Sequence, residues 1–230
     1  MAQTVEGKIP PQALAKEPLL HLAAYSRRVA GEVCHRAKND LQTIANLIAL
    51  AAPYAKSAED LATAVEGRVG ALSVCYTLVA GEGAQPRLDL MAEEVLRRLL
   101  WRYGGLAQVE RQVQELPLSL RICSPLSLWL HEVVGNALIH GLGRSSRPKL
   151  VVQGEMGRDG LSLSVTDNGP GLPSGFDLER HSRLGLRLAK AVAINDLRGR
   201  MDLNQPGRGL QVRLTVPAEE LANLNRSAWQ

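Results

Sequence analysis

His35-Arg36-Ala37-Lys38-Asn39-Asp40-Leu41-Gln42 lies inside a long amphipathic pattern near the start of the chain. On a helix at about 100° per residue, the apolar side chains around it fall within a stripe roughly 80° wide. That stripe consists of Ala30, Val33, Ala37, Leu41, Ile44 and Ile48. His35 is about 165° from the middle of the stripe, close to Lys38, Asn39 and Gln42. We therefore expect an imidazole, an ammonium group and two amides to share one outward face.

The composition is that of a globular chain with a modest positive charge. Of the 230 residues, 45% are hydrophobic and only 3% are aromatic, which predicts an aliphatic core. Lys and Arg number 27 against 23 Asp and Glu, and the net charge of +4 is spread along the chain. This distribution argues against nucleic acid as a partner.

The cysteines and the N-terminal residues indicate a compartment. Cys34, Cys75 and Cys123 are widely spaced among apolar residues, which predicts buried, reduced thiols and neither a disulfide nor a metal site. No export signal is evident at the N-terminus. The stretch 43–52, which we take as the most apolar, is shorter than the ~20 residues that a membrane span needs. We expect a cytoplasmic protein without membrane insertion.

The first part of the chain predicts a helical hairpin over residues 17–82, after a flexible lead-in at 1–16. One helix is expected at 18–52 and a second at 57–79, with Ser57 as its N-cap. A single hairpin would leave much apolar surface in water. We therefore expect a homodimer that completes a four-helix bundle.

The sequence Gly81-Glu82-Gly83-Ala84-Gln85-Pro86 predicts a domain boundary. Beyond it, strands are expected at 87–90, 107–113, 150–154, 161–166 and 210–216, and helices at 91–103, 125–140 and 184–197. These elements predict an α+β domain at 86–217. A tail at 218–230 would add a short helix.

A polar stripe marks the helix expected at 125–140. Glu132, Asn136 and His140 recur there at every fourth residue, while apolar side chains fill the remaining faces. Carboxylate and amide oxygens are hard ligands that suit Mg²⁺, which usually arrives with phosphates. The plainer alternative is a solvated helix face.

Two glycine-containing stretches follow. Asp167-Asn168-Gly169-Pro170-Gly171 would hold a carboxylate on a tight turn, with room for a flat ligand against the backbone. An ordinary surface turn is the alternative. Arg183-Leu184-Gly185-Leu186-Arg187 opens a helix, whose free backbone N–H groups and nearby guanidinium groups suit a polyphosphate.

In their order and spacing these patterns resemble a known family. Glu132 and Asn136, then Asp167-x-Gly169-x-Gly171, then Leu184-Gly185-Leu186 resemble the N, G1 and G2 boxes of the GHKL (Bergerat-fold) ATPases. The opening stretch resembles the phosphoacceptor box of the HRxKN class of bacterial sensor histidine kinases, which are relatives of the HWE kinases. The resemblance implies a hairpin in a dimeric four-helix bundle, followed by a two-layer α/β Bergerat-type ATP-binding sandwich.

The resemblance also implies roles for single residues. His35 would be the phosphoacceptor, Asn136 a Mg²⁺ ligand, and Glu132 would polarise the metal site or a water. Asp167 would accept a hydrogen bond from the adenine amino group. The residues implied beside these are Arg36, Lys38, Asn39 and Gln42 on the phosphoacceptor face, and His140, Gly169, Gly171, Leu184, Gly185, Leu186 and Arg187 around the nucleotide.

Three functions remain open at this point. The first is a two-component histidine kinase that uses ATP and Mg²⁺ to phosphorylate His35 and passes the phosphoryl group to a response regulator receiver domain. Its signal would come from a separate sensor protein, from the short N-terminal segment, or by a direct effect on the dimer. The second is a histidine phosphotransferase relay with a degenerate ATP-binding domain, against which Asn136 and Asp167 argue. The third is a GHKL serine kinase acting as an anti-sigma factor, which would not need the hairpin or His35.

Overall fold

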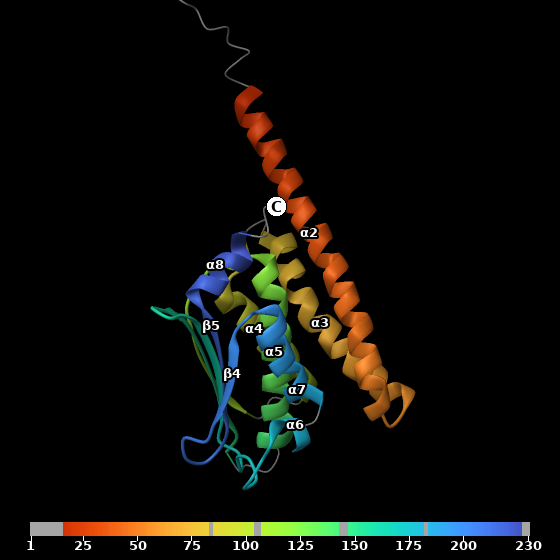
Figure 1. Ribbon diagram of the computed structural model, residues 1–230, viewed down its shortest axis with the longest axis vertical. Helices are drawn as coiled ribbons and strands as arrows, with labels where there is room; N and C mark the ends of the chain where they lie inside the picture. Colours follow the sequence, from red (N-terminus) through yellow and green to blue (C-terminus); the bar gives the residue numbers. More distant parts are fainter. Residues whose placement is uncertain (1–15, 83–84, 104–106, 143–146, 182–183, 227–230) are drawn as a thin grey trace, which may run out of the picture.

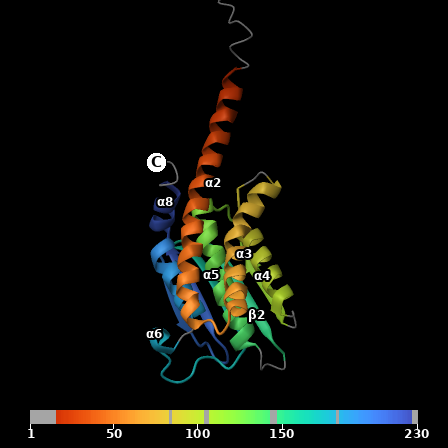
Figure 2. The same ribbon diagram turned by 90° about the vertical axis from the view of Figure 1, so that its right-hand side faces the viewer.

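The structure is a computed structural model that describes residues 16–82, 85–103, 107–142, 147–181 and 184–226. Figures 1 and 2 show three layers: a β-sheet, a layer of helices on one of its faces, and a long helical hairpin packed on those helices. Residues 1–15 of the predicted lead-in and 227–230 of the predicted tail lie outside the described residues, as do two positions of the predicted boundary, Gly83 and Ala84.

The hairpin consists of α2 (Lys16–Ala51) and α3 (Ala58–Glu82), joined through a short 3-10 turn at Ala52–Tyr54. Pro53 lies in that turn, directly after the last residue of the helix expected at 18–52. Ser57 caps α3 as predicted, because its Oγ accepts a hydrogen bond of 3.1 Å from the Asp60 backbone N–H. The N-terminal part of α2 projects beyond the remaining layers (Figure 1).

The buried face of α2 differs from the predicted apolar stripe. Leu41 and Ile48 are 66% and 42% exposed, whereas Asp40 and Leu47 are buried. A carboxylate can occupy the buried face because Asp40 accepts hydrogen bonds from hydroxyl groups of α3 and α5, which replace its water. Leu41 and Ile48 are therefore left on a separate, exposed side of the helix.

The sheet has five strands in the order β1-β2-β3-β5-β4. They are β1 (Gln108–Val113), β2 (Lys149–Gly157), β3 (Gly160–Asp167), β5 (Gln211–Pro217) and β4 (Arg200–Asn204). β1 and β2 are parallel, and all other neighbours are antiparallel. In β2, buried Leu150 and Val152 alternate with exposed Gln153 and Glu155. The sheet thus buries one face against the helices.

Helix α5 (Leu120–Asn136) lies between the hairpin and the sheet and continues into a π-helical turn at Ala137–Gly141. The other helices are α4 (Leu88–Tyr103), α6 (Leu178–His181), α7 (Leu184–Ala191), a second π-helical turn at Val192–Asp196, and α8 (Ala218–Arg226). One continuous buried cluster runs from Leu47 and Ala71 in the hairpin through Trp129 in α5 to Val216 in β5.

Among the described residues, Leu120–Gly141 is the one helix whose length and apolar composition could cross a membrane, and 72% of its apolar window is buried inside the structure. The long apolar stretch of the chain is therefore this helix, and not residues 43–52 as the sequence suggested. Its composition matches its place in the core, where α5 contacts both helices of the hairpin and strand β3 of the sheet.

Three sequence predictions about local structure were wrong. The strand expected at 87–90 is absent, because α4 starts at Leu88, and Arg87 forms only an isolated bridge with Pro117. Helix α5 begins five residues before Pro125, so this proline lies inside the helix, where its missing N–H leaves the helix one hydrogen bond short. Cys75 and Cys123 are buried as expected, but Cys34 is exposed on α2.

Candidate functional site

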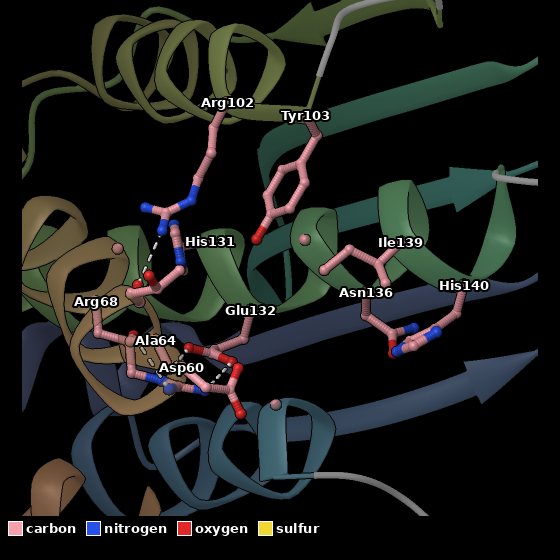
Figure 3. A pocket seen from close by; sticks show the side chains of 14 residues that line it. Asp60, Ala64, Arg68, Arg102, Tyr103, His131, Glu132, Asn136, Ile139 and His140 are labelled. Carbon is pink, nitrogen blue, oxygen red and sulfur yellow. Dashed lines mark hydrogen bonds and ion pairs between the residues drawn. The ribbon is translucent and has the colours of Figure 1, made fainter. Parts of the chain in front are cut away.

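A pocket of about 250 Å³ lies where α3, α5 and the start of α7 meet (Figure 3). Its walls are formed by Asp60, Thr63, Ala64, Gly67 and Arg68 of α3, Arg102 and Tyr103 of α4, His131, Glu132, Gly135, Asn136, Ile139 and His140 of the central helix, and Gly185 of α7. The hairpin and the helix layer of the α/β region therefore enclose one site together.

The polar stripe of the central helix faces this pocket as predicted. Glu132 is buried, Asn136 is half-buried and His140 is exposed. Figure 3 shows Asn136 and His140 beside one another, further along the helix than Glu132. His140 belongs to the π-helical turn, a feature that is often found at functional sites.

Arg68 binds Glu132 across the pocket. Its Nε donates to Oε1 at 2.7 Å and its Nη2 to Oε2 at 3.1 Å, and the two side chains are only 9% and 6% exposed. Burial raises the pKa of Glu132, and the Arg68 guanidinium opposes that shift. The sequence analysis did not identify Arg68 as a site residue, although a charged residue on the buried side of a helix is itself a signal.

Gly185 allows α7 to start directly against Glu132. A Cβ atom at Gly185 would lie 2.9 Å from Glu132 Oε2, so a larger residue would press on the carboxylate. Of its neighbours, Leu184 is half-buried and Leu186 is buried in the core. Arg187 lines a different pocket, of about 330 Å³, between α7 and the end of α2.

The turn after β3 adjoins the end of the central helix. The Gly169 N–H donates to Asp167 Oδ1 at 2.8 Å. A Cβ on Gly141 would lie 2.7 Å from Asp167 Cγ, and one on Gly169 would lie 2.1 Å from the Gly141 carbonyl oxygen. Burial raises the pKa of Asp167, and the hydrogen bond from the Gly169 N–H opposes this rise. Gly171 has φ +76°, a conformation that side chains disfavour.

These groups fit a purine nucleotide with bound Mg²⁺. An ionised carboxylate only accepts hydrogen bonds and so suits an amino group such as that of adenine. Amide oxygens such as that of Asn136 suit Mg²⁺, which also takes ligands from phosphates. The start of α7 supplies backbone N–H groups for an anion. Sequence analysis missed Gly141, whose small size lets the helix and the Asp167 turn meet.

His131 lines the α4 side of the same pocket. Burial and the nearby cations Arg68 and Arg102 lower its pKa to about 4. The Cβ position of Gly67 is 3.1 Å from its Nε2, so α3 packs closely against the imidazole. His131 is therefore neutral near pH 7 and belongs to the contact between α3 and α5.

The stretch around His35 lies on α2, and the structure describes the backbone but not the side chains of His35 and Arg36. Lys38, Asn39 and Gln42 are exposed as predicted. Gln42 Nε2 donates to Asn46 Oδ1 at 3.4 Å. This face is thus open to solvent at the three positions that the structure describes.

The pocket and His35 lie at different levels of the hairpin. Tyr76 donates a hydrogen bond of 2.7 Å to Asp40 and so aligns α3 with α2. His35 is five residues before Asp40, away from the bend, and Arg68 is eight residues before Tyr76, toward the bend. At 1.5 Å per residue, His35 and Arg68 are about 20 Å apart along the hairpin. The structure therefore keeps the His35 backbone away from the pocket.

Two family profiles match the chain in succession. Residues 32–112 match the HWE histidine kinase family, and residues 124–220 match the family described as histidine kinase-, DNA gyrase B- and HSP90-like ATPase. The first match contains His35 and Arg68, and the second contains Glu132, Asn136, Asp167 and Gly185.

Named relatives and solved structures are similar along most of the chain. The sensor histidine kinase PdtaS of Mycobacterium tuberculosis is 30% identical over 81% of this chain, and a blue-light-activated histidine kinase of Rhizobium johnstonii is 24% identical over 86%. This chain spans 38% and 55% of those proteins. The fold resembles the Erythrobacter litoralis EL346 blue-light activated histidine kinase, with a TM-score of 0.65 and 22% identity over 86% of this chain and 64% of that one.

Proposed function

We propose that the chain is an ATP-dependent protein-histidine kinase that phosphorylates His35, because residues 32–112 match the HWE histidine kinase family and residues 124–220 match the histidine kinase-, DNA gyrase B- and HSP90-like ATPase family. One observation carries this proposal. The residues of three separate boxes meet around the end of one helix, with Glu132, Asn136 and Gly185 in one pocket and Asp167 beside it.

In this proposal each group of the site has one task. Asp167 accepts a hydrogen bond from the adenine amino group, with Gly169 and Gly171 shaping the base pocket. Asn136 holds Mg²⁺, which when bound would neutralise phosphate charge. The start of α7 lies by the phosphates. The proposed contributors there are the backbone of Leu184, Gly185 and Leu186, with His140 from the central helix. Arg187, which lines the neighbouring pocket in this conformation, would have to turn toward the phosphates.

The proposed reaction is an in-line phosphoryl transfer to an imidazole nitrogen. A bond forms between that nitrogen of His35 and the γ-phosphorus, while the bond from phosphorus to the bridging oxygen breaks and ADP leaves with the electron pair. Lys38 lies close in sequence and is exposed, so its charge could screen the incoming phosphates. Glu132 polarises the metal site or orders a water. In the second step the nitrogen–phosphorus bond breaks and an aspartate carboxylate of a receiver domain takes the phosphoryl group.

We propose a homodimer as the assembly. Leu41 and Ile48 are seven residues apart on α2, which places them on the same side of the helix, and both are exposed. Burial of this side against a second hairpin would remove apolar surface from water. The further proposed partners are a response regulator receiver domain and a separate sensor protein, and the proposed location is the cytoplasm.

Incubation with γ-labelled ATP and Mg²⁺ tests the proposal. We expect acid-labile label on the wild-type chain and none on His35→Ala. His21→Ala removes the other histidine of α2 and should leave labelling unchanged. Asp167→Asn should abolish labelling together with nucleotide binding.

Two other outcomes would replace the kinase by the alternatives. If the chain takes no label from ATP but accepts it at His35 from a phosphorylated response regulator, it is a relay protein. If acid-stable label appears on an added partner protein, it is a serine kinase.

A further inference from the structure

The hairpin forms one wall of the candidate nucleotide pocket, and a side chain from it reaches the catalytic stripe. Arg68 projects from α3 to both carboxylate oxygens of Glu132, as Figure 3 shows. Its Nη1 also donates to the Ala64 carbonyl oxygen of its own helix at 3.2 Å. The guanidinium is thus fixed at three points, in a site where the proposed reaction brings Mg²⁺ and phosphates.

The pocket in this conformation is small and carries negative charge on two sides. Its volume of about 250 Å³ is below the ~300 to 1,000 Å³ usual for ligand sites. Glu132 lies on one wall and Asp60 on the α3 wall. Arg68 and Arg102 are the cations of the same lining, and the guanidinium that balances Glu132 belongs to the hairpin, so it is not free for a phosphate while the pair is intact.

We propose that the ion pair between Arg68 and Glu132 is a latch that holds α3 against α5 in a resting conformation. Binding of a Mg²⁺-nucleotide is then coupled to release of α3 from α5. The inference rests on the proposed ATP site. Removing Arg68 from Glu132 leaves a buried carboxylate unpaired, which is costly until another cation compensates it. A metal-bound nucleotide supplies that cation, so the two events favour each other.

Separation of α3 from α5 would also allow the ATP site to approach the phosphoacceptor His35. His35 lies about 20 Å along the hairpin from the Arg68 level. While α3 stays paired with α5, the helix layer is held at the bend end of the hairpin. Coupling is reciprocal, so a nucleotide that loosens this contact must bind more tightly once the contact is weakened.

Two other arginines offer a matched control. Arg98 of α4 donates to the Gly70 carbonyl at 2.6 Å and to Ser73 Oγ at 3.1 Å, and Arg102 donates to the Thr63 carbonyl at 3.0 Å. They join the helix layer to the same helix without a bond to Glu132 among the described contacts. Arg98→Met therefore weakens the helix contact while leaving the Arg68–Glu132 pair intact.

The experiment is calorimetric titration of the full chain with Mg²⁺ and a non-hydrolysable ATP analogue. We expect Arg68→Met to lower the dissociation constant about tenfold. Arg98→Met loosens α3 without unpairing Glu132, so it should lower the dissociation constant by no more than a few fold. Thermal unfolding of each variant checks that it is folded.

A second pair of variants weakens the contact without creating an unpaired charge. The added Cβ of Gly67→Ala would press on the His131 imidazole at 3.1 Å, whereas that of Gly70→Ala would meet its nearest atom, in the Arg98 guanidinium, at 3.6 Å. We expect only Gly67→Ala to tighten nucleotide binding, by a few fold. Both variants gain the same helix propensity, so they share the intrinsic stabilisation of α3.

The outcomes are distinct. Equal affinities of wild type and both latch variants, Arg68→Met and Gly67→Ala, would contradict the latch and leave the ATP site standing. Weaker binding by folded Arg68→Met would make Arg68 a phosphate ligand and overturn the latch. Binding by neither wild type nor variant would contradict the ATP site, and the latch with it.

Discussion

His131 joins the chemistry of the pocket to the stability of the fold. It lies beside the proposed catalytic Glu132, and α3 packs against its ring. Its pKa of about 4 in the folded chain is below the ordinary histidine value of 6.5. Between these values the unfolded chain binds more protons than the folded chain. The contribution of His131 to the free energy of unfolding is therefore fully present above pH 6.5 and is lost as the pH decreases toward 4.

We expect this loss to amount to about 3 kcal/mol, the equivalent of about two and a half pKa units. Urea unfolding at pH 7.5 and at pH 4.5 measures it. His131→Gln cannot titrate and should flatten this part of the pH dependence. The same pH dependence in His131→Gln and in the wild type would show that other groups cause it.

Gly169 tests the close approach at the Asp167 turn. The Cβ of Gly169→Ala would fall 2.1 Å from the backbone oxygen of Gly141, so the turn or the helix end must move. We expect a loss of at least about 2 kcal/mol in the free energy of unfolding and loss of nucleotide binding. Gly157→Ala, whose nearest atom is 3.8 Å away, is the control and should change stability by less than about 1 kcal/mol. A stable, nucleotide-binding Gly169→Ala would show that the approach is looser than described.

The sequence predicted which residues form the site, but it did not predict which residues of other helices contact them. The stripe of Glu132, Asn136 and His140 follows from helical spacing alone, and the Asp167 turn follows from its glycines. Arg68 could not be paired with Glu132 from the sequence, because the two are 64 residues apart and local spacing does not specify which helices pack together. Gly141 gave no signal for the same reason.

At the scale of the helices, periodicity predicted the hairpin and most strands but not which side of α2 is buried. Helical spacing marks an apolar stripe, and it cannot show that a buried hydroxyl will satisfy a carboxylate. Asp40 accepts hydrogen bonds from Tyr76 of α3 at 2.7 Å and from Ser124 of α5 at 3.0 Å. One carboxylate therefore joins three helices, each from a different stretch of the chain.

We expect this three-helix junction to show energetic coupling. Tyr76→Phe should lower the free energy of unfolding by about 1 kcal/mol, the net value of one hydrogen bond. Asp40→Ala should cost about 2 to 3 kcal/mol, because it removes the acceptor from two largely buried hydroxyls. In the double variant the losses should not add, and urea unfolding of all four proteins measures the difference. Fully additive losses would mean that the Tyr76–Asp40 hydrogen bond does not stabilise the fold.

At the scale of the whole molecule, the hairpin and the α/β region share one buried core. Sequence composition predicted a boundary near residues 81–86, which remains a proposal about folding units. It could not predict that α3 would cover α5, since that contact depends on how the two regions pack. The consequence is functional, because the covered helix carries the proposed catalytic stripe while the phosphoacceptor lies further along the hairpin.

A distance measurement across the molecule tests whether the two regions move. Cys34 is exposed next to His35, and Cys75 and Cys123 are buried, so a spin label can be directed to α2. A second label at Asn195→Cys would lie beside Leu50 and Tyr54, near the bend of the hairpin. With Mg²⁺ and a non-hydrolysable ATP analogue, we expect a new population whose distance is shorter by about 10 to 20 Å, as the α/β region approaches His35. Arg68→Met should show part of this population before nucleotide is added, since the latch is then open. An unchanged distance, in a protein that still phosphorylates His35, would instead mean that the phosphoryl group comes from the ATP site of a second chain.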